Sequence, residues 1–252
     1  MLIDVNCALG RWPFQRSESL TPDALEAHLA AEGVQRALVY SLDAVLAPDV
    51  AHCNRQLLEA LRSSATLRPV PTVDPSMPAW RETLAACRDT GWLGAVRVVP
   101  NYHLYRLDDP TVDALAEALT QADATLAIQV RVEDERGQYP MLKMPGVPAD
   151  DIAALARRHP TLRILCLCCY LPEARRLAAA SANLFVETSF IECLDTLRYA
   201  TEVIPAQQLA FGTYTPVFYT RANRMKLTSA EVSAEVREQV AWQTAARLFP
   251  RL

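Results

Sequence analysis

Residues 162–188, LRILCLCCYLPEARRLAAASANLFVET, contain the unit from which this chain is built. An apolar run, LRILCLC, is followed by a helix-like stretch, LPEARRLAAA, and then by a second apolar run, NLFVET. Short continuous apolar runs are typical of parallel strands buried on both faces. A strand, a helix and a second strand in this order predict a right-handed crossover between two parallel strands.

The same alternation runs through the whole chain. Six further apolar runs occur at 2–5 (LIDV), 36–40 (RALVY), 68–73 (RPVPTV), 94–99 (GAVRVV), 125–132 (TLAIQVRV) and 208–212 (QLAFG). Eight β-then-α units predict an α/β fold, a closed (β/α)8 TIM barrel forming a single domain over residues 1–252, with an open doubly wound sheet as the alternative. No Gly-x-Gly-x-x-Gly follows any run, which disfavours a dinucleotide-binding sheet. The barrel predicts that the strand ending at Phe211 pairs with the strand at 3–5, and that residues 229–248 form a helical tail outside it.

Composition excludes several classes of function. The net charge is −4 and no block of Lys and Arg occurs, so we expect no nucleic-acid partner and no binding to anionic lipid. No run of eighteen apolar residues and no signal-peptide pattern is present, which predicts no membrane span and a cytoplasmic location. Seven cysteines, an odd number, favour reduced thiols over a disulfide framework. A homo-oligomer is compatible with these features.

Polar residues gather where the predicted strands end, which is the catalytic face of such barrels. His103 is the best-placed histidine on that face, and its ordinary pKa suits proton transfer near neutrality. We predict catalytic roles for His103, Glu133 and Tyr214. We predict substrate-binding roles for Asn6, Arg97, Asn101, Tyr105, Gln129, Arg131, Arg136, Cys168 and Tyr219.

Two arginines dominate the electrostatics of the predicted site. Arg97 and Arg131 fall on neighbouring strands at inward positions, and a buried guanidinium needs a partner anion. One interpretation pairs them with Glu133 and Glu187 in a structural ion-pair layer. The other makes them a clamp for a substrate carboxylate, held through paired hydrogen bonds.

Several motifs resemble the amidohydrolase-related branch of the TIM-barrel metal-dependent hydrolases. They are, in order, IDVN, VPTVDPSMPAW, GAVRVVPNYHLYRLDDP, HPTLRILCLCCY and LAFGTYTP. The resemblance implies decarboxylases or lactonases of small acids, and a divalent ion held by two histidines on the first strand, one each on the fifth and sixth, and an aspartate on the eighth. The corresponding positions here hold Asn6, Ala8, Gln129, Cys168 and Tyr214.

This substitution of ligands predicts a protein with no metal and no other cofactor. A site rebuilt from His103, Glu133 and Cys168 is the alternative, because zinc needs three or four converging ligands. We predict a metal-independent amidohydrolase-like enzyme that acts on a small carboxylate-bearing molecule, by hydrolysis of an ester or lactone or by a lyase reaction such as decarboxylation. The alternative is a non-catalytic pseudoenzyme that binds a ligand or a partner subunit.

Overall fold

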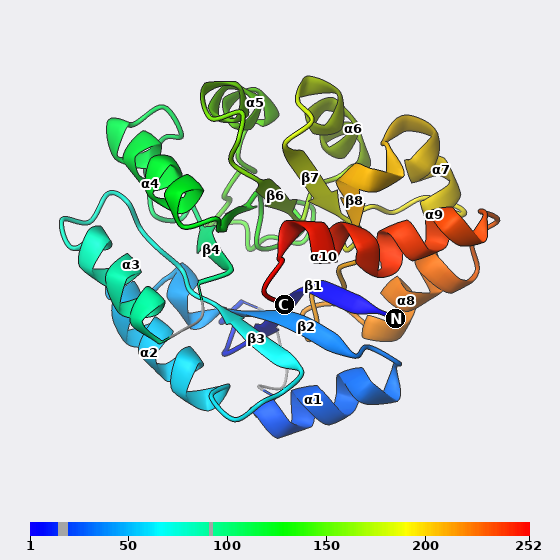
Figure 1. Ribbon diagram of the computed structural model, residues 1–252, viewed down its shortest axis with the longest axis horizontal. Coiled ribbons are helices and arrows are strands. Elements are labelled where there is room, and N and C mark those ends of the chain that lie inside the picture. The colour runs from blue at the N-terminus through cyan, green and yellow to red at the C-terminus, as the bar shows by residue number, and fades with distance from the viewer. Residues whose placement is uncertain (15–19, 91–92) are drawn as a thin grey trace.

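Eight parallel strands alternate with helices along the chain. The computed structural model describes residues 1–14, 20–90 and 93–252. The strands are β1 (Ile3–Leu9), β2 (Arg36–Ser41), β3 (Leu67–Val70), β4 (Ala95–Val98), β5 (Thr125–Gln129), β6 (Ile164–Leu167), β7 (Leu184–Glu187) and β8 (Leu209–Ala210). The helices between them are α1 (Pro22–Ala31), α2 (Val50–Ala60), α3 (Trp80–Asp89), α4 (Pro110–Gln121), α5 (Ala149–Arg158), α6 (Leu171–Ala180), α7 (Thr196–Val203) and α8 (Thr220–Thr228). Figure 1 shows these helices as a ring around the strands.

The strands close into a barrel. They pair in two parallel arcs, β1-β2-β3 and β4-β5-β6-β7-β8. One seam is bridged where the Arg97 amide donates to the Pro71 carbonyl at 2.8 Å. At the other seam the Val5 amide donates to the Phe211 carbonyl at 3.0 Å, so the predicted pairing of the last strand with the first is confirmed.

Two layers of apolar side chains fill the barrel and surround it. Successive residues of a strand point to opposite faces, so Leu165 and Leu167 of β6 lie in the inner cluster, whereas Ile164 and Cys166 lie in the outer one. Cys168 belongs to the inner cluster. Continuous apolar runs are therefore required here because both faces of each strand are buried.

The C-terminal segment differs from the prediction. It comprises α9 (Ala234–Glu238), a π-helical turn and α10 (Thr244–Leu248), so it is helical as expected. Its first part packs outside the barrel, since Val240 and Ala241 belong to the outer cluster. Its last part does not, because Ala245, Leu248 and Phe249 belong to the inner cluster. The Thr125 hydroxyl, at the start of β5, donates to the Leu248 carbonyl at 2.6 Å. In Figure 1, α10 crosses the end of the barrel where β1 begins, and it seals the amino ends of the strands.

This position of α10 leads to a stability prediction. Leu248→Ala should lower the free energy of unfolding by about 2–5 kcal/mol, because it leaves a cavity in the inner cluster. The matched control is Leu194→Ala, since Leu194 is 87% exposed and the same truncation should cost less than about 0.5 kcal/mol there. Urea unfolding of both variants measures the difference. Equal small losses would show that the tail does not belong to the barrel core.

Candidate active site

Four of the predicted site residues meet at the carboxyl ends of the strands. The Cys168 sulfur accepts from the Asn6 amide nitrogen at 3.4 Å and from the Gln129 amide nitrogen at 3.2 Å. Tyr214 packs in the same inner cluster, and its hydroxyl donates to the Val132 carbonyl at 2.8 Å. Both Cys168 and Tyr214 adopt left-handed backbone conformations, with φ of 61° and 56°. Such conformations cost energy in non-glycine residues and occur often at functional sites.

Glu187 lies at the centre of this polar cluster, although its position at the end of a strand was the only sequence signal for it. Its carboxylate accepts hydrogen bonds from the Asn6 side-chain amide at 3.0 Å, the Cys168 backbone amide at 2.7 Å and the Ser189 hydroxyl at 2.7 Å. The Ser189 backbone amide supplies a further bond. Gly212 is required beside it, because a Cβ there would collide with the Glu187 carboxylate.

The cluster does not suit the divalent ion that the resemblance implies. The five corresponding positions are Asn6, Ala8, Gln129, Cys168 and Tyr214. Only the thiol of Cys168 and the neighbouring carboxylate of Glu187 are common metal ligands. Burial raises the pKa of Cys168, which keeps the thiol protonated, and neutral donors already occupy the Glu187 carboxylate. In the part of the chain that the structure describes, no group of three or more His, Cys, Asp or Glu side chains could hold a metal, and this includes the set His103, Glu133 and Cys168.

Arg97 is a buried cation with neutral partners. Its guanidinium donates to the Thr72 hydroxyl from Nε at 3.1 Å and from Nη2 at 3.0 Å, and also to the Ser41 carbonyl. The Tyr40 ring lies 5.4 Å away. Among residues 1–14, 20–90 and 93–252, no carboxylate forms an ion pair with it. Burial lowers the pKa of Arg97 to about 10, which leaves it charged at neutral pH.

Arg131 has a different environment. It lies two residues beyond β5, and its side chain is 1% exposed. The guanidinium pairs with Glu173 of α6 through two bonds of 2.6 and 2.5 Å, a bidentate geometry. It also stacks over the Tyr170 ring at 3.8 Å and donates to the Cys168 carbonyl at 2.7 Å. Arg131 therefore fixes the loop that carries Cys168.

The expected pairs between the arginines and Glu133 or Glu187 do not form. Arg131 pairs with Glu173, which the sequence analysis missed because Glu173 lies in a helix N-terminus where it also caps the backbone of Tyr170. Among residues 1–14, 20–90 and 93–252, Glu187 accepts hydrogen bonds only from neutral donors. Glu133 is partly buried, and burial raises its pKa. Because Glu173 already neutralises Arg131, the structure gives no support to its part in the predicted two-arginine anion clamp, which stays a prediction.

His103 lies in the loop after β4 with its ring largely buried. Nε2 is 3.1 Å from the Ala44 carbonyl, which can only accept, so we assign the proton to Nε2. Nδ1 has no hydrogen-bond partner and lies 3.9 Å from the carboxylate of Asp74. Burial lowers the pKa of His103, so the imidazole is neutral at pH 7 and offers a free lone pair. Its acidic neighbour is Asp74.

Four other predicted residues lie outside the polar cluster. Tyr105 belongs to the outer apolar cluster, because the loop turns its ring away from the barrel axis. Asn101 donates to the Pro145 carbonyl at 2.9 Å and joins two loops. Arg136 and Tyr219 are exposed, with Arg136 paired to its near neighbour Asp134. Among the described residues, none of these four forms a hydrogen bond, an ion pair or a ring contact with Arg97 or with the polar cluster, so their substrate contacts stay predictions.

Aromatic side chains cover the carboxyl end of the barrel. The Trp12 ring lies 5.7 Å from that of Tyr102, and Phe14 stacks on Tyr139 at 6.3 Å. These contacts join the loops that follow β1, β4 and β5. Asn6, Gln129 and Cys168 are fully buried.

The ion pair of Arg131 gives a testable prediction. Arg131→Met should lower the free energy of unfolding by about 3 kcal/mol, because it leaves the Glu173 carboxylate without its partner. Arg136→Met is the matched control: Arg136 approaches Asp134 to 2.5 Å but is 76% exposed, so its removal should cost less than about 1 kcal/mol. Thermal and urea unfolding compare the two. A loss for Arg131→Met no larger than the control would contradict its structural role.

Comparisons with known proteins place the chain among solved barrels. It superposes on 5-carboxyvanillate decarboxylase from Sphingomonas paucimobilis with a TM-score of 0.76 and 16% identity, covering 99% of this chain and 98% of that one. The 2,6-dihydroxybenzoate decarboxylase from Rhizobium gives 0.75 at 16% identity, covering 99% and 98%. The 4-oxalomesaconate hydratase from Rhodopseudomonas palustris gives 0.71 at 13% identity, covering 100% and 96%. These likenesses show the fold alone.

Sequence comparison is more specific about family. No curated protein sequence matches the chain. No helix among the described residues has the length and apolar character needed to cross a membrane. The family model described as Amidohydrolase matches residues 7–251, nearly the entire chain. This protein therefore belongs to the amidohydrolase family.

Proposed function

We propose that this chain is a metal-independent enzyme that binds a small carboxylate-bearing molecule at the carboxyl ends of its strands. The reaction is hydrolysis of an ester or lactone, or a lyase reaction such as decarboxylation. The observation that carries the proposal is the buried guanidinium of Arg97, which has only neutral partners among the described residues. A substrate carboxylate would supply the missing counter-charge.

The surroundings of Arg97 favour a ligand over a structural role. A buried charge without an opposite charge destabilises a fold, and an apolar side chain of similar volume is often more stabilising. Thr72 and the Ser41 carbonyl hold the guanidinium in place, and the Asn54 side chain in turn fixes the Thr72 backbone through bonds of 2.7 and 2.8 Å. Arg97 is thus pre-organised, which lowers the entropic cost of binding an anion.

His103 is the proposed proton-transfer group. Its free Nδ1 can take a proton from water as the oxygen attacks an ester carbonyl, and the resulting imidazolium can return that proton to the leaving oxygen. Asp74, 3.9 Å away, would stabilise the imidazolium. In a decarboxylation the bond to the carboxyl carbon breaks, CO2 leaves and the substrate carbon keeps the electron pair. His103 would then deliver to that carbon a proton that its Nδ1 has taken from water. Gln129, Asn6 and Tyr214 are proposed to orient the substrate.

A general base that acts without a metal ion limits the substrates that the enzyme can attack. Without a Lewis acid to lower the pKa of water, attack on an unactivated amide is slow. Reactive esters and lactones, or acids whose decarboxylation leaves a stabilised carbanion, are therefore the substrates that fit. Some structural neighbours are decarboxylases of aromatic acids, which supports a substrate of this size.

The second candidate is a non-catalytic binding protein. The aromatic side chains over the carboxyl end of the barrel favour this alternative. So does the dense hydrogen bonding of Asn6, Cys168 and Glu187, which leaves these groups little capacity to bond a substrate. Under this alternative Arg97 still binds an anion, but His103 transfers no proton.

We also propose a reducing compartment such as the cytoplasm. The seven cysteines are all unpaired, and six of them are buried. Free thiols in this number are typical of proteins kept reduced.

The anion site predicts a ligand response. Benzoate, 2,6-dihydroxybenzoate or fumarate should raise the melting temperature, because a ligand that binds only the folded state adds RT ln(1 + [L]/Kd) to its stability, about 2.7 kcal/mol at 100 times Kd. Arg97→Met should abolish this response and leave the ligand-free melting temperature unchanged or higher. No response in the parent protein to any of the three acids would remove the support for an anion site.

Turnover then distinguishes the two candidates. The acid that gives the largest thermal shift, together with its methyl ester, is incubated with the parent protein and with His103→Gln. An enzyme should consume one of them at a rate that His103→Gln lowers at least 100-fold, consistent with the loss of a general base, while the thermal shift is retained. A thermal shift without any consumption by the parent protein would favour the binding protein.

The side chains at the strand ends predict a low metal content. Protein purified without chelators should carry well under one equivalent of Zn, Mn or Fe, because the strand ends offer Cys168 as a protonated thiol and Glu187 as an already saturated carboxylate. Adding EDTA should leave the melting temperature unchanged, since no metal-linked folding energy is lost. Elemental analysis and differential scanning calorimetry make the measurement. One equivalent of metal that EDTA removes with a fall in melting temperature would overturn metal independence.

A further inference from the structure

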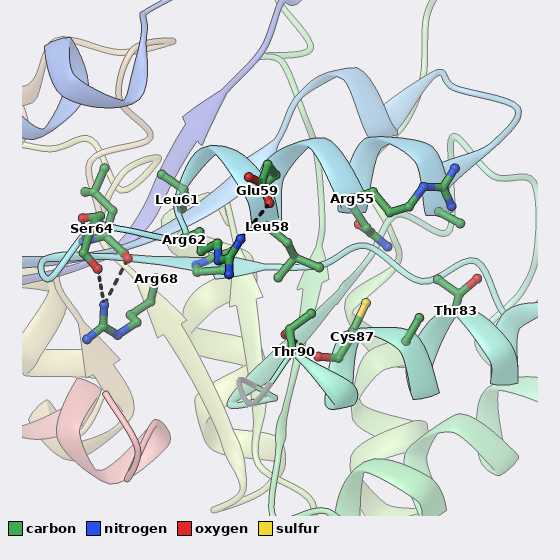
Figure 2. A pocket seen from close by; sticks show the side chains of 15 residues that line it. Arg55, Leu58, Glu59, Leu61, Arg62, Ser64, Arg68, Thr83, Cys87 and Thr90 are labelled. Carbon is green, nitrogen blue, oxygen red and sulfur yellow. Dashed lines mark hydrogen bonds and ion pairs between the residues drawn. The ribbon is translucent and has the colours of Figure 1, made fainter.

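A hollow lies on the outside of the barrel, between α2 and α3. Its volume is about 890 Å³, within the range of small-molecule sites. Figure 2 shows side chains from both helices and from β3 around it. Leu58, Leu61, Leu67 and Cys87 form an apolar floor, and Ala86 of α3 is exposed at its edge.

The rim of this hollow is basic. Arg55, Arg62 and Arg68 line it, with Glu59 as the one acidic residue among the lining side chains. Arg55 and Arg62 are 3.9 and 4.0 Å from the nearest carboxylates, at the limit of an ion pair, and their side chains are 67% and 80% exposed. Arg68 donates to the Ser64 carbonyl at 2.9 Å, as Figure 2 shows. The three guanidiniums therefore keep most of their capacity to bind an anion.

We propose that the α2–α3 groove binds a small amphipathic anion, an organic acid with an apolar chain or ring. The apolar part would cover Leu58, Leu61 and Leu67, and the carboxylate would lie between Arg62 and Arg68. An apolar floor with a few convergent polar groups is the usual composition of a ligand site. A second copy of this chain fits less well, because a two-fold contact through the groove would bring the arginine rims of both copies together.

The groove is separate from the barrel mouth, although Asn54 and Thr72 link it to Arg97. Asn54 lines the groove, and its side chain hydrogen-bonds the backbone of Thr72. The Thr72 hydroxyl accepts from Arg97 on the inner side of the sheet. A test of the groove must therefore exclude binding at Arg97.

Octanoate is the probe, and binding is measured by calorimetry and by thermal shift in the Arg97→Met background, so that the proposed active site does not contribute. Octanoate should bind and raise the melting temperature. Octanol, which lacks the charge, and octylammonium, which reverses it, should bind at least 10-fold more weakly. Failure of the active-site proposal leaves this result unchanged, because Arg97 is already removed.

Two independent variants locate the binding. Ala86→Trp fills the groove from an exposed position and should abolish octanoate binding, and Arg62→Glu should weaken it at least 10-fold. Arg221→Glu, at an exposed position of α8, is the matched control and should change nothing. Octanoate binding that survives both groove variants, or that octanol reproduces, overturns the proposal. So does a dimer in light scattering that Ala86→Trp dissociates, since the groove would then belong to a second copy.

Discussion

The hydrogen bonds to the Glu187 carboxylate hold the carboxyl end of the barrel together. The carboxylate collects donors from β1 through Asn6, from the turn after β6 through the Cys168 amide, and from its own turn through Ser189. In the family that the sequence resembles, a divalent ion would tie several strand ends together. Here a buried anion and amide donors perform that structural task. A fully hydrogen-bonded buried carboxylate is stable only while every donor is present, so the network resists partial change.

The two buried arginines show how differently one side chain can be used. Arg131 is neutralised by Glu173 and stacked on Tyr170, so its role is to hold a loop in place. Arg97 has the same degree of burial but meets only a hydroxyl, a carbonyl and a ring. Since desolvation costs both side chains a similar amount, Arg97 keeps a larger unsatisfied electrostatic demand. That difference, rather than the presence of arginine, is the basis for the proposed anion site.

The sequence predicted the barrel because strand periodicity and order are local properties, and eight apolar runs left few alternatives. It also predicted that Asn6, Gln129, Cys168 and Tyr214 converge, since the ends of parallel strands meet at one face. The partners of individual side chains could not be predicted from the sequence in the same way. Glu173 pairs with Arg131 across 42 residues, and α10 enters the inner core because the amino end of the barrel needs a cover. Such contacts depend on distances that a linear pattern does not contain.

Several buried polar atoms without a hydrogen-bond partner lie at the carboxyl end of the barrel. The side-chain oxygens of Asn6 and Gln129 and the Nδ1 of His103 are all buried acceptors without a hydrogen-bond partner, and they come from the same end of the barrel as Arg97. Each such group lowers stability by about 1–3 kcal/mol. A pocket that had closed permanently around its own side chains would gain stability by pairing or replacing them. One cation and three free acceptors at the same end of the barrel would instead suit the proposed ligand, if it carries an anion together with hydroxyl donors. The combination supports the proposed ligand site at the carboxyl end of the barrel.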